Sequence, residues 1–470
     1  MLQTGWPVGT PPPVRTFEEI GMEHHRHPDG ARALQPEQCP FHGGSNRFPS
    51  TLLTEEILLD PFAVYRMFRS ERPVAFIPDQ NLWIISRYDD CRFVLEHPAK
   101  FSSKEAVSST NAYRRSPEAL EILRRSKATP RARTLIMSDP PEHDGYREIL
   151  YRALAPGKTV RALTPKMKLI IDELIDSFCE RGSCEFVREF AYPLPMRVVA
   201  AILDVPDGQI DMLKAWSDDF IAVQAGNIPA DRIVSSAQHT LEFEEFILRK
   251  LDDRQRNPRD DFLGRLVNQP PHEKRLSVPE LLNICLQVLV GGNETTTNFL
   301  GSALFTIINK PALLEDIRHN GARIPQLIEE ILRTESPLQG LFRIAKEDHA
   351  FGNVVVPRGA KVMLCFGSAN RDEAYYGTGE IDPTRDYKRN MHFAFGHGIH
   401  ACAGQAFARR EGVLAVEAVV KRLSGLRLSK KAPPLRQLLF GIRGFKELHI
   451  EFDPTPKGAL TPMCRDGRRA

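Results

Sequence analysis

The segment at residues 277–310, SVPELLNICLQVLVGGNETTTNFLGSALFTIINK, restricts the possible folds of this chain more than any other. Ser277 and Glu280 predict a capping-box start, and the helical pattern then continues for roughly thirty residues, about 50 Å at the rise of an α-helix. The helix is apolar on nearly every face, so it has to run through the core of a large helical domain. The amides, the acid and the threonines along it exclude a lipid-facing span.

The middle of this segment, GGNETTT at residues 291–297, is poor helix material because it combines two glycines, an acid and three β-branched residues. Residues that disfavour a helix but lie inside a buried helix often mark function or strain. The glycines would let a large group approach the backbone, and a threonine hydroxyl can bond the carbonyl one turn earlier. Glu294 beside Thr295 is therefore a candidate proton relay, although a kink with a satisfied polar pair explains the same pattern.

A second unusual stretch, FAFGHGIHACAGQAFARREG at residues 393–412, gathers three glycines, two histidines and one cysteine within its first dozen residues. An amphipathic helix follows, so Cys402 lies just before a helix N-terminus, where unpaired N–H groups and the dipole favour a thiolate. No second cysteine or histidine stands at a spacing typical of a structural zinc site. A single thiolate fits the iron of a macrocycle, which takes four equatorial ligands from its own ring.

Two other interpretations of this stretch are weaker. An inert buried cysteine would not need three glycines after an aromatic run. Residues 396–401 also match the dinucleotide-binding pattern G-x-G-x-x-A. That pattern requires a hydrophobic strand before the first glycine and a βαβ unit around it, and the preceding NMHFAF is a poor strand.

A third motif is the pair Glu330 and Arg333 in IPQLIEEILRTESP. Residues three apart share one helix face, so the acid and the base can form an ion pair. Taken singly the motif is weak, because most such pairs are solvated pairs on the surface.

The rest of the chain indicates a mainly α protein with a minor β component. Helical periodicity dominates after residue 134, and short strands are expected in VAFIPDQNLWIIS, FGNVVVPRGAKVMLCFG and FKELHIEF. We expect a partly irregular arm over residues 1–45, one catalytic domain over residues 46–455 and a C-terminal tail over residues 456–470.

The bulk composition narrows the partners. The formal net charge is only +3, which argues against nucleic acid as the main partner. No segment reads as a secretory signal or a membrane anchor, and eight cysteines lack zinc-finger or redox-pair spacing. We therefore expect a reduced, cytoplasmic protein without a membrane partner.

Together the three motifs resemble those of the cytochrome P-450 family, the haem-thiolate monooxygenases. The haem loop of that family, F-G-x-G-x-H/R-x-C-x-G, is matched at every position by residues 395–404. Its central-helix motif, A/G-G-x-D/E-T-T, is matched by residues 291–296, and its E-x-x-R motif by residues 330–333. The resemblance covers most of the chain. It implies a triangular helical domain with small sheets around a buried haem.

The resemblance also assigns roles to single residues. It implies that the Cys402 thiolate is the axial ligand of haem b, which is iron protoporphyrin IX. Arg385 becomes the third partner of the Glu330–Arg333 pair, although it lies about two residues farther from the haem loop than is usual. Other positions of this sequence match family residues that contact the haem or its propionates, namely His143, Arg147, Arg343, His392, Phe395, His400 and Gly404.

The activity implied by the resemblance is oxygen-dependent. Electrons from a separate ferredoxin and its reductase would drive activation of O2, Glu294 and Thr295 would relay protons, and a small hydrophobic substrate would be hydroxylated or oxidatively dealkylated. An acidic ferredoxin would dock on basic residues, with Arg133, Arg152, Arg409 and Arg410 as candidates. The alternatives are a peroxygenase that uses hydrogen peroxide and a haem-binding sensor without turnover.

Substrate contacts follow from the same resemblance. The expected set is mostly apolar, which favours a terpenoid, a steroid, a fatty acid or an aromatic compound. The long basic segment at residues 104–133 either caps the pocket or forms a solvated helix face. The expected contact residues are Gly292, Leu338, Leu341, Phe342, Leu439 and Phe440.

Overall fold

The computed structural model describes residues 48–104, 106, 112–128, 132–225, 228–270, 275–387 and 391–459. The chain divides into two compact units, residues 1–49 and residues 50–470. The arm expected over residues 1–45 lies outside the described residues, as does the tail from residue 460 onward. All helices and strands of the described residues belong to the second unit.

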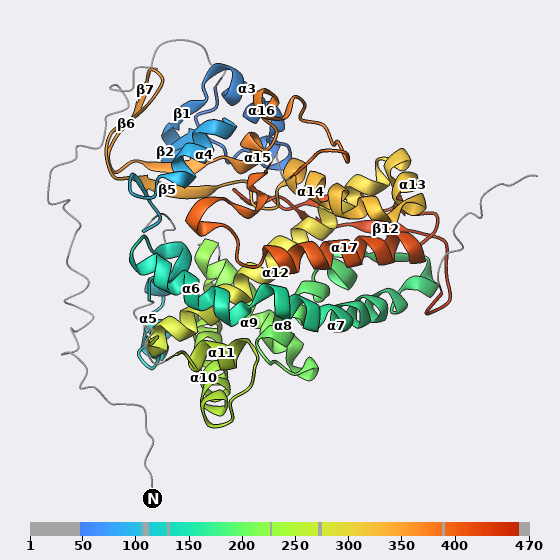
Figure 1. Cartoon of the computed structure of the whole chain (residues 1–470), viewed down its shortest axis with the longest axis horizontal. Helices are drawn as coiled ribbons and strands as arrows, with labels where there is room; N and C mark the ends of the chain where they lie inside the picture. The colour runs from blue at the N-terminus through green and yellow to red at the C-terminus, as the bar shows by residue number, and fades with distance from the viewer. Residues whose placement is uncertain are drawn as a thin grey trace, which may run out of the picture. The chain divides into compact units, whose positions relative to one another are not determined.

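The long helix expected at residues 277–310 is present as α12 (Val278–Ile308), which is 31 residues long. Both hydrogen bonds of the predicted capping box between Ser277 and Glu280 are formed. The helix is buried along most of its length and contacts α8, α9, α10, α14 and α17. Figure 1 shows it crossing the middle of the second unit, between the helices α6 to α11 and the part that contains the largest sheet. The prediction of a core helix is confirmed.

Helices of several lengths surround α12. Their bounds are α2 (Glu55–Leu59), α3 (Phe62–Glu71), α4 (Tyr88–Glu96), α5 (Pro117–Leu123), α6 (Glu142–Leu154), α7 (Pro156–Asp176), α8 (Pro193–Ile202), α9 (Ile210–Ala225), α10 (Ile233–Arg256), α11 (Phe262–Val267), α13 (Pro311–His319), α14 (Ile324–Glu335), α15 (Phe366–Ala369), α16 (Glu373–Tyr376) and α17 (Gln405–Arg422).

The strands form small sheets, and the largest has the order β1-β2-β8-β5-β3. β1 and β2 are the two strands expected in VAFIPDQNLWIIS, with Asn81 in the left-handed region between them. β8 pairs parallel with β2 and antiparallel with β5, which fixes Arg343 opposite Val362. The strand bounds are β1 (Val74–Ile77), β2 (Leu82–Ile85), β3 (Phe101–Ser102), β4 (Ser183–Glu185), β5 (Leu341–Ala345), β6 (His349–Phe351), β7 (Val354–Val356), β8 (Lys361–Leu364), β9 (Arg427–Leu428), β10 (Leu435–Arg436), β11 (Phe445–Glu447) and β12 (His449–Glu451).

Two hydrophobic clusters meet at the glycine-rich stretch that contains Cys402. The larger cluster is built on α12 with α7, α8, α14 and α17, and the smaller one on the five-stranded sheet with α4 and α15. Phe393 belongs to the smaller cluster, whereas Phe395 and Ala403 pack against the larger one. The position of Cys402 is therefore fixed from both sides.

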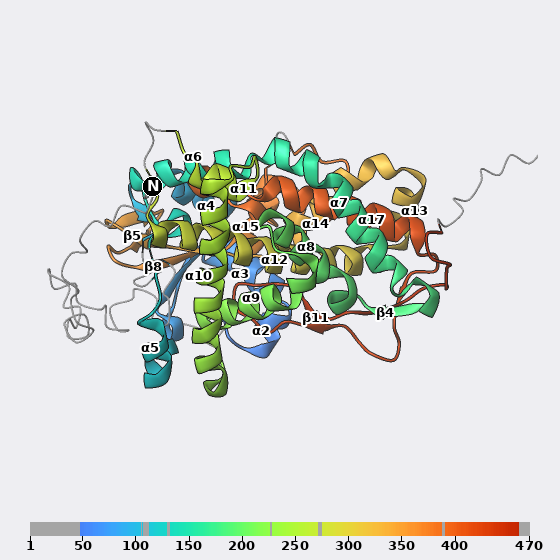
Figure 2. The same cartoon turned by 90° about the horizontal axis from the view of Figure 1, so that it is seen from below.

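A further cluster joins α5 to α10. Tyr113 and Leu123 pack there with Ile233 and Ala237 of α10, and the Tyr113 hydroxyl lies 3.1 Å from Ser236 Oγ. Figure 2 shows α5 beside one end of α10. Residues 112–128 of the basic segment are thus attached to α10.

No helix of the described residues is both long enough and apolar enough to cross a membrane.

The crossing of α12 and α17 yields a stability prediction at Gly412. A Cβ atom there would lie 2.4 Å from Phe299 Cε1 and 3.5 Å from Ile328 Cδ1. We expect Gly412→Ala to lower the free energy of unfolding by about 1–3 kcal/mol through overpacking, as measured by urea denaturation. Gly157→Ala in α7 is the control, because no atom lies within 4 Å of the added Cβ. Equal losses in the two variants would contradict the prediction.

Candidate active site

The backbone around Cys402 is shaped by two glycines in the left-handed region, Gly396 with φ of 65° and Gly398 with φ of 68°. At Gly398 a side chain would also collide, because a Cβ atom would lie 2.6 Å from the Leu95 carbonyl oxygen. The Cys402 N–H donates to the Phe395 carbonyl oxygen at 2.7 Å. These contacts place Cys402 directly before α17.

The sulfur of Cys402 differs from the other thiols of the described residues. Those are buried, whereas Cys402 is partly exposed. Burial among its neighbours raises the pKa of the Cys402 thiol, and the N–H groups of Gly404 and Gln405 only partly oppose the rise. The helix N-terminus alone therefore does not ionise this thiol. Coordination of a metal ion deprotonates a thiol and would complete the step.

The middle of α12 exposes one face although most of the helix is buried. Gly291 and Thr295 are exposed, and the Thr295 hydroxyl donates to the Gly291 carbonyl oxygen at 3.1 Å. The two residues share a face because they are four apart. Glu294 beside them is half-buried, and burial followed by the charge of Asp218 raises the pKa of its carboxyl.

Four of the expected propionate-binding residues come together. The rings of His143 in α6 and His400 are 4.3 Å apart between centroids. Burial first, and then Arg343, His143 and Arg147, lower the pKa of His400 to about 3. Arg147 donates to the Ala401 carbonyl oxygen at 2.5 Å, which ties α6 to the cysteine stretch.

The surroundings of Arg343 indicate that these four residues bind an anion. Arg343 is only 6% exposed, and its guanidinium donates a hydrogen bond to the Phe342 carbonyl oxygen. Within the described parts of the chain, no carboxylate forms an ion pair with Arg343 or Arg147. A buried cation is costly without a counter-charge. The carboxylates of a porphyrin would supply that charge.

The contacts of His392 differ from those of the other four residues. Its Nε2 lies 3.1 Å from Glu329 Oε2, and its Nδ1 accepts from the Ala394 N–H at 3.2 Å. Both ring nitrogens are thus engaged. Arg409 also binds Glu329, with its Nε 2.7 Å from Oε1, and lies 4.3 Å above the Phe395 ring. Arg409, expected at a docking surface, is therefore largely used to hold the cysteine stretch.

Glu329 was not expected from the sequence. Burial alone would raise the pKa of its carboxyl, but the hydrogen bonds from His392 and Arg409 outweigh burial and lower it to about 2. The sequence offers one signal for this residue, because Glu329 directly precedes Glu330. A helical pattern places these two acids on different faces.

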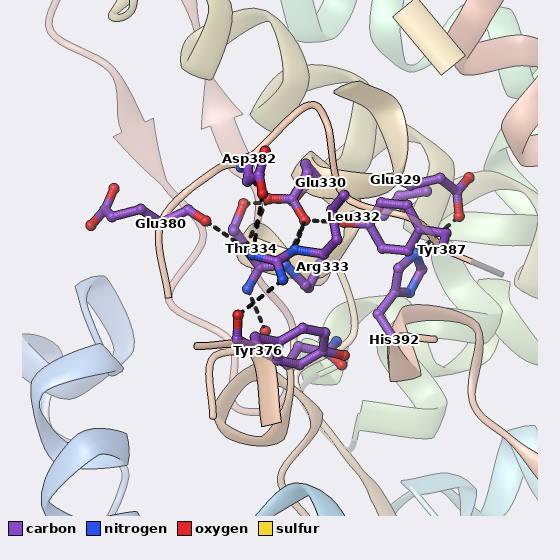
Figure 3. Close-up of polar contacts among 12 residues, drawn as sticks. Glu329, Glu330, Leu332, Arg333, Thr334, Tyr376, Glu380, Asp382, Tyr387 and His392 are labelled. Carbon is purple, nitrogen blue, oxygen red and sulfur yellow. Dashed lines mark hydrogen bonds and ion pairs between the residues drawn. The ribbon is translucent and has the colours of Figure 1, made fainter. Parts of the chain in front are cut away.

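Glu330 and Arg333 form a fully buried ion pair, which Figure 3 shows above Tyr376. The Arg333 guanidinium donates to both carboxylate oxygens, at 2.8 and 2.9 Å. Arg385 Nε lies 3.0 Å from Glu330 Oε1, so the structure brings the expected third partner into place. The Tyr387 hydroxyl also donates to Glu330, a contact that no motif predicted. These bonds lower the pKa of Glu330 against the effect of burial.

The same cluster fixes the chain that leads to the cysteine stretch. Arg333 donates to the carbonyl oxygens of Asn370 at 2.8 Å and Glu380 at 2.6 Å. Arg385 donates to the carbonyl oxygen of Tyr376 at 2.9 Å, and the Asp382 N–H donates to Glu330. α14 is thereby bonded to residues 370–387.

Gly292, one of the expected substrate contacts, lies against a neighbouring helix. A Cβ atom at Gly292 would lie 2.7 Å from Val199 Cγ2 in α8. Gly291 is the glycine that shares the exposed face of Thr295. The two positions differ by about 100° around the helix, so sequence order alone did not separate them.

The apolar residues expected to contact substrate are all partly buried, and three of them are linked in the structure. The rings of Phe342 and Phe440 lie 6.5 Å apart between centroids. Leu338 forms a bridge with Ile442, at the turn that also carries Phe440. Leu439 and Phe440 line a small pocket with residues of α2, whereas Leu341 packs against the cluster on the sheet.

The site combines a cysteine just before a helix N-terminus, a buried and a half-buried arginine without an ion-paired carboxylate in the described residues, and a helix face of glycine and threonine. This set of residues fits a thiolate-bound iron porphyrin. The family model described as cytochrome P-450 matches residues 230–445. The steroid C26-monooxygenase of Mycobacterium tuberculosis is 32% identical over 84% of this chain and 94% of that protein.

Two further matches agree. The 6-deoxyerythronolide B hydroxylase of Saccharopolyspora erythraea is 29% identical over 86% of this chain and 98% of its own length. The structure of CYP109E1 from Bacillus megaterium in complex with corticosterone is 28% identical, with a TM-score of 0.72 over 85% of this chain and 99% of that one. This chain belongs to the cytochrome P-450 family. It is an oxidoreductase of the monooxygenase class, whose members bind haem b through a cysteine thiolate and use O2 with a redox partner.

The buried ion pair predicts a large effect at Glu330. Replacing it in Glu330→Gln leaves two buried arginines without their carboxylate, and we expect the free energy of unfolding to fall by about 3–5 kcal/mol in urea denaturation. Glu315→Gln is the matched control, because Glu315 pairs with Arg318 at the same spacing but is 56% exposed. The control should lose about 1 kcal/mol or less. Similar losses in both variants would refute the structural role.

Proposed function

We propose that residues 46–455 form a monooxygenase that hydroxylates, or oxidatively dealkylates, a small hydrophobic molecule with electrons from a separate ferredoxin and its reductase. The observation that carries this proposal is the exposed hydroxyl of Thr295 beside the half-buried acid Glu294. Such a pair serves proton delivery and has no purpose in a protein that only holds haem.

The residues of the site divide the work of holding the cofactor. Cys402 would hold the haem iron through its thiolate, and His143, Arg147, Arg343 and His400 would bind the two propionates as charge-assisted hydrogen-bond donors. The bound haem supplies the iron at which O2 is activated and from which one oxygen atom reaches the substrate.

Two side chains of this protein, Glu294 and Thr295, would relay the protons. Burial and Asp218 keep the pKa of Glu294 above its usual range, so this carboxyl holds its proton closer to neutral pH than an exposed glutamate does. The Thr295 hydroxyl is exposed and rotatable, so it can accept a hydrogen bond from one side and donate to the other. Together they pass a proton toward the reacting oxygen while the backbone of α12 stays in place.

The substrate is proposed to be a steroid or a similarly sized apolar molecule. Phe342 and Phe440 approach each other from β5 and from the turn near residue 440, so their rings offer an apolar surface to such a molecule. One relative is named a steroid C26-monooxygenase, and related structures hold corticosterone and testosterone. These names support steroids as the first compounds to test.

The redox partner is proposed to carry an acidic face. Of the basic candidates, Arg133 is exposed, whereas Arg152 and Arg410 are partly buried. Arg410 already contacts Thr164 Oγ1 at 3.3 Å. We therefore expect Arg409 and Arg410 to contribute less to the docking surface than the sequence indicated, and Arg133 to contribute more.

The ligand assignment predicts a spectral change at Cys402. The reduced, carbon monoxide-bound protein should show the Soret band of thiolate ligation, and Cys402→Ala should abolish it because the sulfur is lost. Cys179→Ala is the control, since Cys179 is buried and lies before β4. A band typical of imidazole ligation in the folded wild-type protein would contradict the assignment.

The proposed activity predicts turnover that depends on Thr295. With a ferredoxin, its reductase and a steroid that displaces the haem-bound water, isotopically labelled O2 should appear in the product. In Thr295→Ala the product formed per NADH should fall by about a hundredfold or more, with more hydrogen peroxide released, because proton delivery fails.

Thr306→Ala, on the same helix but away from the exposed face, is the control for this experiment. Turnover with hydrogen peroxide but with no ferredoxin system would establish the peroxygenase alternative. Normal coupling in Thr295→Ala would remove the observation on which the proposal rests.

A further inference from the structure

The carboxylate of Glu329 joins two segments of the site that lie far from it in the sequence. Glu329 belongs to α14, and its side chain is 15% exposed. Arg409 of α17 donates to both carboxylate oxygens, from Nε to Oε1 at 2.7 Å and from Nη2 to Oε2 at 3.0 Å. His392 Nε2 lies 3.1 Å from Oε2. A two-point ion pair of this kind holds a guanidinium in one orientation.

The ion pair places Arg409 over the ring of Phe395. The guanidinium carbon lies 4.3 Å from the ring centroid, which is within the range of a cation–π contact. Arg409 Nη1 also donates to Gln405 Oε1 at 2.7 Å, in the first turn of α17. Glu329, Gln405 and the ring together hold the guanidinium, although the arginine side chain is 36% exposed. The positive charge therefore has a fixed position.

Phe395 connects this charge to the sulfur ligand. Its carbonyl oxygen accepts the N–H of Cys402 at 2.7 Å, and its ring packs against the larger hydrophobic cluster. The guanidinium thus lies over a residue that is bonded directly to Cys402. The electrostatics agree with this placement: burial has the largest effect and raises the pKa of the Cys402 thiol, and Arg409 is among the groups that lower it.

A fixed charge beside a thiolate changes the electron density that the sulfur can give to a metal. The levers that tune a haem iron include contacts to its axial ligand and the charges around it. The ferrous state holds one electron more than the ferric state, so a nearby cation favours the ferrous state and a nearby anion favours the ferric state. Both members of this pair are charged at neutral pH, since hydrogen bonds outweigh burial and lower the pKa of Glu329 to about 2.

We propose that Glu329 and Arg409 are positioning residues that set the reduction potential of the haem on Cys402, an inference that deepens the proposed monooxygenase function and rests on it. Arg409 presents its positive charge to the cysteine stretch, which favours entry of an electron. Glu329 fixes the guanidinium and offsets part of its charge. The electron comes from the redox partner, and the pair makes and breaks no bond.

Reduction midpoints of two charge-removing variants test this assignment in the holoenzyme, without substrate, O2 or ferredoxin. Arg409→Gln should lower the midpoint, because it removes the cation and leaves the anion of Glu329. Glu329→Gln should raise it, because it removes the anion and keeps an amide oxygen for Arg409. Each shift should be at least about threefold in the equilibrium constant for reduction, which is about 28 mV for one electron.

A second ion pair on the same helix supplies matched controls. Lys421 Nζ lies 2.6 Å from Glu417 Oε1, and Lys421 is about three turns farther along α17 than Arg409. Lys421→Gln and Glu417→Gln remove the same kinds of charge from an exposed pair. Both controls should keep the midpoint of the wild type, because water screens them and they lie far from the sulfur. The double variant Glu329→Gln/Arg409→Gln should fall between its two single variants.

The infrared C–O stretch of the ferrous carbon monoxide complex gives a second measurement. A thiolate with less positive charge beside it donates more electron density to the iron and, through the iron, to carbon monoxide, which weakens the C–O bond. Arg409→Gln should therefore lower the C–O frequency, and Glu329→Gln should raise it. A change of packing alone has no reason to move the two variants in opposite directions.

Opposite shifts in the two variants support the proposal. Shifts of equal sign, or wild-type values in both variants, overturn it. If Arg409→Gln does not hold haem, Glu329→Gln decides alone, because a midpoint that stays or falls in that variant overturns the proposal. These measurements need no turnover, so they stand even if the proposed hydroxylation fails. Normal turnover with unshifted midpoints overturns only the role of the pair.

Discussion

The buried carboxylate of Glu330 is the interaction on which the geometry of the active site depends. Removing a charge from water is tolerated only when its oxygens are fully bonded, and here Arg333, Arg385 and Tyr387 all converge on it. Because two of these partners lie in residues 376–387, satisfying the charge also fixes the chain that precedes Cys402. An electrostatic requirement in one helix is thereby converted into the position of a distant sulfur atom.

The charged side chains at the two edges of the site do not form ion pairs with groups of opposite charge. Arg147 and Arg343 lie at one edge without carboxylate partners in the described part of the chain, and Glu294 lies on α12 without a basic partner. Within a protein such unpaired groups are unfavourable. The proposed function gives each of them a task, anion binding for the cations and proton delivery for the acid.

Sequence reasoning succeeded where the signal was local. The capping box at Ser277, the length of α12 and the stretch before α17 all depend on residues close together in the chain. It did not reach the contacts between residues that are distant in the chain, such as that of His392 with Glu329 and that of Gly292 with α8.

The attachment of α5 to α10 has a consequence for how such an enzyme diversifies. Its small cluster around Tyr113 shares no residue with the large core around α12. Substitutions at the residues of this segment that line the small cluster, such as Tyr113 and Leu123, therefore act first on a local unit. The sequence of this cluster can therefore change without altering the packing around the sulfur or the central helix.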